Sequence, residues 1–500
     1  MSRLFSGEAG DYSSLVSSLN GRFRNFSARN SAIIYDGRGN FDLSRNSSAK
    51  TLIMLSIMTI LIGAWLKWSD FDQTLIFIRS FDLGWLYIST GMTMLGINIV
   101  AFLWRLSLVA RYAPAPVCTD QQLPTCTVLV PAYNEGKQVL RTLRSIARSD
   151  FPGSKLEIIA IDDGSKDDTW YWIEKAAREL DGRIITIKMP KNGGKRAALN
   201  EGFKIGTGDV FVTIDSDSLI EPQTLRRLLS PFYHNKQTGA VAGSVRVLNR
   251  HEGIIPRMLD VTFAYCFEFI RSSESQYNTV FCTPGALAAY KRDALMPIRN
   301  KWLKQTFFGR SANIGEDRAL TNWIIRTGWH VKFQCDAIVY TNVPIRYEGL
   351  VKMLLRWARS NVREMLMMAP FIFTDFRKDS KLGARVNYCL NCLNLTIPNI
   401  LLLGVIFCIL WRPDIFIMQV LLGSIMAACV PTAFYALRRQ SSNALWGFAH
   451  NIFWVVALSW INLYSILTMH KDSWLTRELE PANNAQLEDA QPQPVTQTAA

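Results

Sequence analysis

Residues 210–217 read Val210-Phe211-Val212-Thr213-Ile214-Asp215-Ser216-Asp217 and place two carboxylates directly after a run of apolar and β-branched residues. Such a run is typical of a buried β-strand. Similar runs upstream alternate with amphipathic stretches, and this alternation implies a parallel sheet with right-handed crossovers. The sequence therefore predicts an α/β domain built around this strand.

The predicted elements place two acidic clusters at the ends of strands. Strands are expected at 127–130, 156–161, 183–188 and 209–214, with helices at 139–147, 170–180 and 197–205. In parallel sheets, ligands bind outside the carboxyl ends of the strands. The clusters Asp162-Asp163-Gly164-Ser165 and Asp215-Ser216-Asp217 both follow predicted strands. We therefore expect them at one crevice.

Apolar and charged residues are unevenly distributed along the chain. Its 500 residues are 49% hydrophobic, yet the formal net charge is +14. Runs free of Asp, Glu, Lys and Arg are candidate membrane spans, and they lie at 51–66, 83–104, 386–411, 415–437 and 444–469. An anionic lipid surface and an anionic substrate explain the basic excess better than nucleic acid does. We therefore expect membrane lipid, and no nucleic acid, as a partner.

Charge placement predicts the orientation. Seven Lys or Arg residues precede the first run, which favours a cytoplasmic N-terminus, and fifty mostly polar residues there argue against a cleaved signal peptide. Two crossings then return the chain to the cytoplasm. The predicted order is a cytoplasmic segment (1–50), two transmembrane helices (51–104), the α/β domain (112–345), interfacial amphipathic helices (346–385), three or more spans (386–469) and a disordered tail (478–500). The last run is either re-entrant or interfacial, or a further crossing lies near 365–373.

Two loops suggest a nucleotide site. The segment Pro131-Ala132-Tyr133-Asn134-Glu135 follows the first predicted strand, and Asp163 follows the second. Carboxylates at adjacent strand ends can accept hydrogen bonds from a base or ribose, although Asp163 could instead cap a helix. Lys195 and Arg196, at a glycine-bearing helix start, suit a diphosphate. The alternative is a solvated basic turn.

Asp215 and Asp217 are candidate metal ligands. Two carboxylates at this spacing can hold Mg²⁺ or Mn²⁺, which keeps waters and takes further ligands from substrate phosphates. A D-x-D pattern also occurs by chance. The position of this pair after a buried strand is what favours the metal site.

Asp317 is the candidate general base, within Ile314-Gly315-Glu316-Asp317-Arg318. Inverting displacement at an anomeric carbon needs a carboxylate to deprotonate the acceptor hydroxyl, and Glu316 could position that acceptor. Alternatively, the two acids only favour a helix N-terminus. Arg356 and Trp357, on a predicted helix at 347–368, suit an anionic leaving group and a sugar ring. That helix could equally lie on the membrane surface.

These motifs together resemble the family 2 glycosyltransferases, and among them the membrane-embedded processive synthases of hyaluronan, chitin-oligosaccharide and cellulose type. The likeness is greatest to hyaluronan synthases, covers roughly residues 50–478, and depends on the segments 304–309, 314–322, 356–364, 463–465 and 474–477. It implies a cytoplasmic GT-A (Rossmann-like) domain inserted between transmembrane helices, in a multi-pass protein of the plasma or inner membrane.

The resemblance also implies roles for single residues. Asp163 would bind uridine, Asp215 and Asp217 the metal-diphosphate, and Asp317 would be the base. Arg356 and Trp357 would belong to a Q-x-x-R-W motif, while Cys282 and Gly285 would lie on the acceptor side. Two departures from the family pattern are expected near the acceptor, so they bear on product identity: Met353 replaces the motif Gln, and Cys282-Thr283-Pro284-Gly285-Ala286 reorders a Gly-Pro pair.

The sequence thus predicts a processive inverting β-glycosyltransferase that uses UDP-sugars and a growing polysaccharide acceptor. Hyaluronan is the first expected product, and a homopolymer of β-linked GlcNAc or glucose is the alternative. A non-processive transferase acting on a polyprenyl phosphate or glycolipid is a further alternative. A catalytically silent membrane subunit is disfavoured because all the candidate acids are present.

Overall fold

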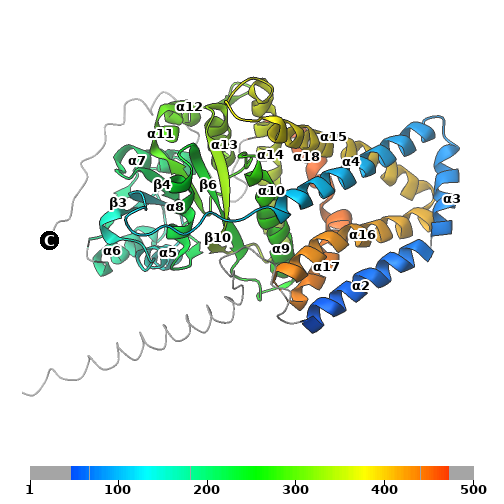
Figure 1. Ribbon diagram of the computed structural model, residues 1–500, viewed down its shortest axis with the longest axis horizontal. Helices are drawn as coiled ribbons and strands as arrows, with labels where there is room; N and C mark the ends of the chain where they lie inside the picture. Colours follow the sequence, from blue (N-terminus) through cyan, green and yellow to red (C-terminus); the bar gives the residue numbers. More distant parts are fainter. Residues whose placement is uncertain (1–46, 67, 181, 440, 472–500) are drawn as a thin grey trace, which may run out of the picture.

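The computed structural model describes residues 47–66, 68–180, 182–439 and 441–471. An α/β domain lies at one end of the molecule and a group of long apolar helices at the other (Figure 1). The predicted segment 1–50 lies almost wholly outside the described residues, and the predicted tail 478–500 lies entirely outside them.

The α/β domain contains an eight-stranded sheet in the order β3-β2-β1-β4-β7-β6-β10-β5. Its strands are β1 (Cys126–Ala132), β2 (Leu156–Asp162), β3 (Ile184–Lys188), β4 (Val210–Thr213), β5 (Leu219–Ile220), β6 (Thr238–Val247), β7 (Ala288–Lys291) and β10 (His330–Thr341). A separate hairpin pairs β8 (Thr306–Phe307) with β9 (Arg310–Ser311). The four strands predicted from the sequence are therefore β1 to β4.

The four predicted strands pair in parallel, as expected, but the complete sheet is mixed. The pairs β1–β2, β1–β4, β2–β3 and β6–β10 are parallel, whereas β7 is antiparallel to both β4 and β6, and β5 is antiparallel to β10. The chain leaves β6 at its carboxyl end through a long helical segment and enters β7 from a loop at that same end of the sheet. β7 therefore runs in the opposite direction to β6.

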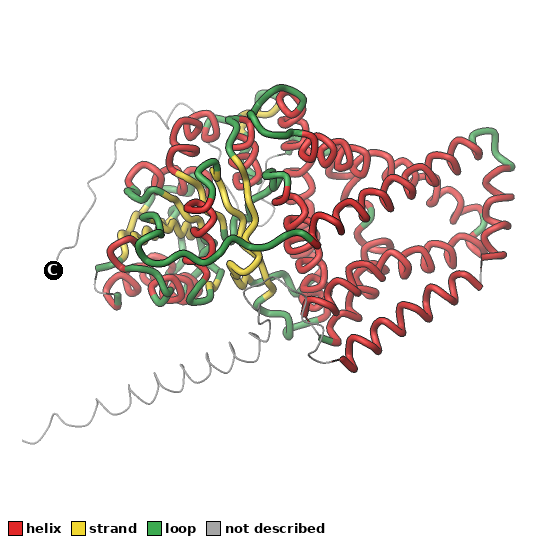
Figure 2. The backbone as a smooth tube through the Cα atoms, viewed as in Figure 1, coloured by secondary structure: helices red, strands yellow, loops and turns green. Residues whose placement is uncertain are grey.

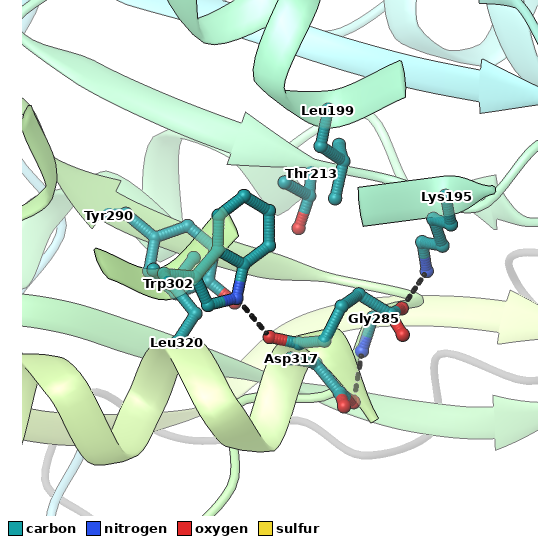
Figure 3. A pocket seen from close by; sticks show the side chains of 9 residues that line it. Lys195, Leu199, Thr213, Gly285, Tyr290, Trp302, Asp317 and Leu320 are labelled. Atoms are coloured by element: carbon teal, nitrogen blue, oxygen red, sulfur yellow. Dashed lines mark hydrogen bonds and ion pairs between the residues drawn. The ribbon is translucent and has the colours of Figure 1, made fainter. Parts of the chain in front are cut away.

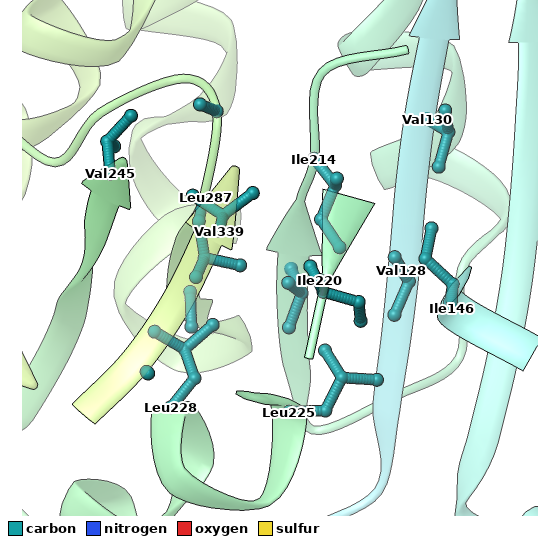
Figure 4. Packing of buried hydrophobic residues seen from close by; sticks show 14 of the residues in the cluster. Val128, Val130, Ile146, Ile214, Ile220, Leu225, Leu228, Val245, Leu287 and Val339 are labelled. Atoms are coloured by element: carbon teal, nitrogen blue, oxygen red, sulfur yellow. The ribbon is translucent and has the colours of Figure 1, made fainter. Parts of the chain in front are cut away.

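Helices cover both faces of the sheet (Figure 2). One face packs on α5 (Gln138–Ala147), α6 (Thr169–Glu179) and α8 (Thr224–His234), and the other on α7 (Lys195–Ile205) and α13 (Glu316–Arg326). Alternate residues of β1 follow this division, because Val128 and Val130 join the first core (Figure 4) and Leu129 the second. The short α11 (Arg292–Leu295) and α12 (Arg299–Leu303) complete the domain.

Two long helical segments join the domain to the apolar helices. The first runs through α9 (Ile254–Phe263), a π-helix (Ala264–Ile270) and α10 (Arg271–Gln276), and the sequence analysis did not anticipate it. The second, α14 (Tyr347–Ile372), extends the predicted helix at 347–368. Its last turns, near the alternative crossing at 365–373, bury Met368 and Ile372 in the domain core, so they form no separate span.

The apolar helices are α2 (Ser47–Leu66), α3 (Trp68–Arg79), α4 (Gly84–Ala110), α15 (Leu382–Trp411) and α16 (Pro413–Arg439). Within the described residues, α4, α15 and α16 are long and apolar enough to cross a membrane, while the apolar part of α2 is shorter. The predicted last run is broken into Ser442–Leu458 and Trp460–Leu467, bent by 47°. A pair bent in this way is either a broken span or a re-entrant segment, and the second of these is one of the predicted alternatives.

The last-run helices are α17 (Trp446–Phe453), a π-helix (Trp454–Leu458) and α18 (Trp460–Leu467). The end of α16 is held against the π-helix Ala264–Ile270, where Arg438 lies 3.4 Å from Glu268 and Arg439 also pairs with that carboxylate. Tyr435 donates a hydrogen bond of 2.6 Å to Asp260. The end of α16 therefore lies on the side of the apolar helices that faces the α/β domain.

Candidate active site

A small pocket lies beside the carboxyl end of β4, where the N-termini of α7 and α13 meet (Figure 3). Its lining includes Lys195, Gly285, Tyr290, Trp302, Glu316 and Asp317. Residues from segments more than one hundred positions apart in sequence therefore share one site.

Lys195 is the positive centre of this pocket. Its Nζ pairs with Asp215 and lies 3.1 Å from Oε1 of Glu316. Burial alone would lower the pKa of Lys195, but Asp215 and Glu316 hold that pKa above its ordinary value. The side chain is therefore an ammonium at neutral pH. The structure brings together three predicted site residues that the sequence spreads over 122 positions.

Asp317 lies in the first turn of α13, which begins after Gly315 in the left-handed region at φ 69°. One carboxylate oxygen accepts a hydrogen bond of 3.1 Å from the backbone N–H of Gly285, and the other accepts one of 2.7 Å from the N–H of Arg318. Burial, followed by the charge of Glu316, raises the pKa of Asp317. A carboxylate with a raised pKa is a better proton acceptor at neutral pH.

The pKa values of Glu316 and Cys282, which neighbour Asp317, are shifted in opposite directions. Burial would raise the pKa of Glu316, but Lys195, helped by Arg356, holds it below the ordinary value. The two adjacent carboxylates are therefore shifted in opposite directions, as in sites where one acid stays ionised and the other exchanges a proton. Burial and Asp317, 3.9 Å away, raise the pKa of the Cys282 thiol to about 11. Cys282 is thus a neutral thiol at physiological pH.

Asp215 and Asp217 follow β4 and face different partners. Asp215 pairs with Lys195, whereas Oδ1 of Asp217 accepts hydrogen bonds from Ser218 at 3.1 Å and Thr341 at 3.3 Å. Among the described residues, no group of three or more His, Cys, Asp and Glu side chains is placed to hold a cation. The two carboxylates nevertheless fit Mg²⁺ or Mn²⁺, because such ions accept one or two protein carboxylates and complete their shell with water and phosphate.

The predicted nucleotide side is built from the turn after β2. Asp163 is buried, accepts a hydrogen bond of 2.8 Å from the N–H of Gly193, and donates its own N–H to the carbonyl of Ala132 at 2.9 Å. A Cβ on Gly164 would lie 2.5 Å from the carbonyl carbon of Lys191, so this turn packs directly on the basic loop. Asp163 therefore braces that loop and does not cap α6.

The segment after β1 approaches the same edge of the sheet. Tyr133 and Glu135 are half-buried, and the N–H of Glu135 donates 2.8 Å to Thr169 Oγ1. Ala132, Tyr133 and Glu135 are absent from the lining of the Lys195 pocket. They lie with Asp163 at the carboxyl ends of β1 and β2, where the sequence predicts a nucleotide site.

Arg196 does not accompany Lys195 into the pocket. Its guanidinium is buried, donates to the carbonyl of Trp302 at 2.7 Å, and lies over the Trp302 ring at 5.2 Å. The prediction that both basic residues hold a diphosphate is therefore wrong for Arg196. Successive helical residues point about 100° apart, so only one of the two can face the site.

On α14, Arg356 and Trp357 lie in different surroundings. The charge of Arg356 helps to lower the pKa of Glu316. Trp357, in contrast, is 41% exposed, and its ring centroid lies 5.9 Å from that of Phe263 of α9. Met353, which replaces the motif Gln, was expected near the acceptor. It is buried instead in an apolar cluster that also contains Leu350 and Leu355.

Sequence reasoning missed Trp302 and Tyr290. The fully buried Trp302 donates its indole N–H to the carbonyl of Glu316 at 2.9 Å, and the Tyr290 hydroxyl lies 2.9 Å from that of Thr283. Thr283 in turn contacts Thr321 of α13. No local pattern marks these residues, because their role comes from contacts across the fold.

The chain is similar to known glycosyltransferases in both sequence and structure. The family model described as Glycosyl transferase family 2 matches residues 127–299. An N-acetylglucosaminyltransferase of Azorhizobium caulinodans is 28% identical over 360 residues, which cover 71% of this chain and 88% of that protein. A hyaluronan synthase of Streptococcus pyogenes serotype M3 is 29% identical over 331 residues, covering 65% and 74%.

A solved structure shares the fold. The mannosyltransferase PcManGT from Pyrobaculum calidifontis, in complex with GDP-Man and Mn²⁺, superposes with a TM-score of 0.50 at 20% identity, covering 73% of this chain and 97% of that one. The α/β fold with flanking apolar helices, predicted from the sequence, is confirmed as a GT-A-like fold.

Proposed function

The chain carries a glycosyl transferase family 2 domain, and we propose that it transfers sugars from UDP-sugar donors, with inversion, to a growing polysaccharide. The observation that carries this proposal is the arrangement around Lys195. An ammonium lies between Asp215 and Glu316, and the carboxylate with the raised pKa, Asp317, lines the same pocket.

These residues divide the work of an inverting displacement. The acceptor hydroxyl attacks the anomeric carbon, the bond to the diphosphate breaks, and Asp317 takes the hydroxyl proton. Lys195 and Arg356 offer positive charge to the departing UDP. A divalent cation, Mg²⁺ or Mn²⁺ on Asp215 and Asp217, would supply further positive charge to that leaving group. Asp163 and the segment Ala132–Glu135 hold the nucleotide, and Cys282 and Gly285 border the acceptor.

Two kinds of relative support the choice of donor. One group is named for N-acetylglucosaminyl transfer and the other for hyaluronan synthesis, at nearly the same identity. UDP-GlcNAc is the donor that both chemistries share. We therefore assign UDP-GlcNAc as a donor, used alone for a β-linked GlcNAc polymer or in alternation with UDP-GlcA for hyaluronan.

The proposal places the reaction at a membrane. The helices α4, α15 and α16 would span it, with the catalytic domain of residues 112–345 on the cytoplasmic side, where nucleotide sugars are available. The growing chain would leave between the helices of 51–104 and 386–469. The basic excess of the chain suits anionic lipid on the same side.

Release of UDP by the purified, detergent-solubilised protein tests this function. UDP-GlcNAc, UDP-GlcA and UDP-Glc are supplied singly and in pairs with Mn²⁺, beside Asp317→Asn. Turnover with UDP-GlcNAc that Asp317→Asn abolishes supports the proposal, and dependence on UDP-GlcA selects hyaluronan. A product of one added sugar on an extracted lipid would contradict polymer synthesis, as would turnover that Asp317→Asn leaves intact.

A further inference from the structure

A second polar cluster is buried in α14, outside the residues that line the pocket. Its centre is the carboxylate of Glu364, which is 1% exposed, beside Arg363, which is fully buried. Burying charged groups is costly unless they are paired and hydrogen-bonded. The contacts of Glu364 show what this arrangement holds together.

Glu364 joins three segments of the chain. Gln305 Nε2, just before β8, donates to Glu364 Oε1 at 2.9 Å, and Asn322 Nδ2 of α13 donates to Oε2 at 3.0 Å. Arg363 Nε lies 3.4 Å from Oε1. Trp323 Nε1 donates to the amide oxygen of Gln305 at 3.0 Å. A second residue of α13 is therefore linked to Glu364, in this case through Gln305. The carboxylate of Glu364 therefore holds α13, and the residue before β8, against α14.

The same residues reach the turn that presents Asp317. The Arg363 guanidinium donates to the carbonyl of Ile314, directly before Gly315. A Cβ on Gly315 would lie 1.8 Å from Ser360 Oγ, so this turn is pressed onto α14 with no spare room. Glu316 and Asp317 follow at once.

We propose that Glu364 is a positioning residue that orients Arg363, and through it the Ile314–Gly315 turn, so that Asp317 stays at a fixed place relative to Arg356. Arg356 lies on the same helix, about two turns before Glu364. A single rigid helix thus sets both the base and the cation on the leaving-group side. The inference rests on the proposed function of Asp317 as the base.

The test compares Glu364→Gln with Glu348→Gln. Glu348 lies on the same helix, but its side chain is 80% exposed and pairs only locally with Lys352 at 2.6 Å. We expect Glu364→Gln to lower kcat by about 10²-fold, because misplacement of a catalytic group by about 1 Å has that effect. The Kd for UDP should stay within about twofold, and Glu348→Gln should behave as wild type. Unchanged kcat in Glu364→Gln overturns the proposal.

A double variant separates positioning from stability. Arg363→Met with Glu364→Met replaces both charged groups with apolar side chains, which often preserves stability. We expect a Tm near that of wild type but a kcat as low as in Glu364→Gln, because the bond to Ile314 is lost. Recovery of both Tm and kcat would show that the pair is only structural.

Hydrogen exchange gives a readout that needs no turnover. Amides of residues 314–318 should exchange about tenfold faster in Glu364→Gln, because the turn opens more often when its support is lost. A tenfold increase in opening corresponds to a loss of about 1.4 kcal/mol of local stability. Unchanged exchange there overturns the positioning role, even if the wild-type protein releases no UDP. Absence of wild-type turnover with faster exchange would instead count against the proposed function alone.

Discussion

Substitution of Gly285 by alanine should disable the pocket without disturbing the fold. A Cβ at this position would lie 2.5 Å from Lys195 Nζ and 3.6 Å from Glu316 Oε1. The backbone of Gly285 needs no left-handed conformation, so the substitution meets a side chain and not backbone strain. The end of Lys195 is the part that must move.

The magnitude follows from these distances. Ordinary contact begins at 3.4 Å, so Nζ must shift by about 1 Å, and it cannot then keep both its pairing with Asp215 and its 3.1 Å contact with Glu316. A displacement of this size typically costs about 10²-fold in rate. We therefore expect kcat/KM for UDP release to fall by about two orders of magnitude, while Tm stays near that of wild type.

Gly153→Ala is the matched control, because nothing lies within 4 Å of its Cβ position in a surface turn of the same domain. Steady-state UDP release and thermal unfolding of both variants decide the matter. A Gly285→Ala protein with more than half of the wild-type kcat/KM would refute the assignment of Lys195 to the reacting centre.

Three further predictions address the base, the cation and the turn. Asp317→Asn should lower kcat by about 10²–10⁴-fold with UDP binding retained. Burial and the charge of Glu316 raise the pKa of Asp317, so Glu316→Gln should move the acid limb of the pH–rate profile to lower pH. An acid limb that does not move would contradict the coupling of the two carboxylates. EDTA should stop UDP release and Mg²⁺ or Mn²⁺ restore it, with Asp217→Asn needing more cation; a rate indifferent to EDTA would exclude the metal. Gly315→Ala should unfold at lower temperature, since a left-handed φ alone costs about 1–2 kcal/mol, and Ser360→Gly should recover only the steric part.

The strand ends were predictable because they depend on local pattern. Buried runs with acidic ends gave β1 to β4 within a residue or two, and parallel strands bring Asp163 and Asp215 to one edge. The antiparallel β7 was not predictable. Four residues, Ala288–Lys291, carry no signal of direction, and their pairing depends on where the long segment from α9 to α10 returns the chain.

The site was predictable as a set of residues but not as a set of contacts. Lys195, Asp215, Glu316, Asp317 and Gly285 all meet. The ammonium bridge between two carboxylates came only from tertiary structure, as did the support behind the Asp317 turn. Arg196 was predicted beside Lys195 because the two are adjacent in sequence. Neighbouring helical residues point in different directions, and Arg196 faces the core.

The anomeric configuration and length of the product formed from UDP-GlcNAc show whether the protein makes a polymer with inversion. Proton NMR of that product, made by the purified protein with or without UDP-GlcA, reports the coupling constant at each anomeric position, and gel filtration reports its size. We expect a β-linked polymer of many residues, absent from the Asp317→Asn reaction. An α-linked product, or free GlcNAc with no chain, would contradict inverting polymer synthesis at this site.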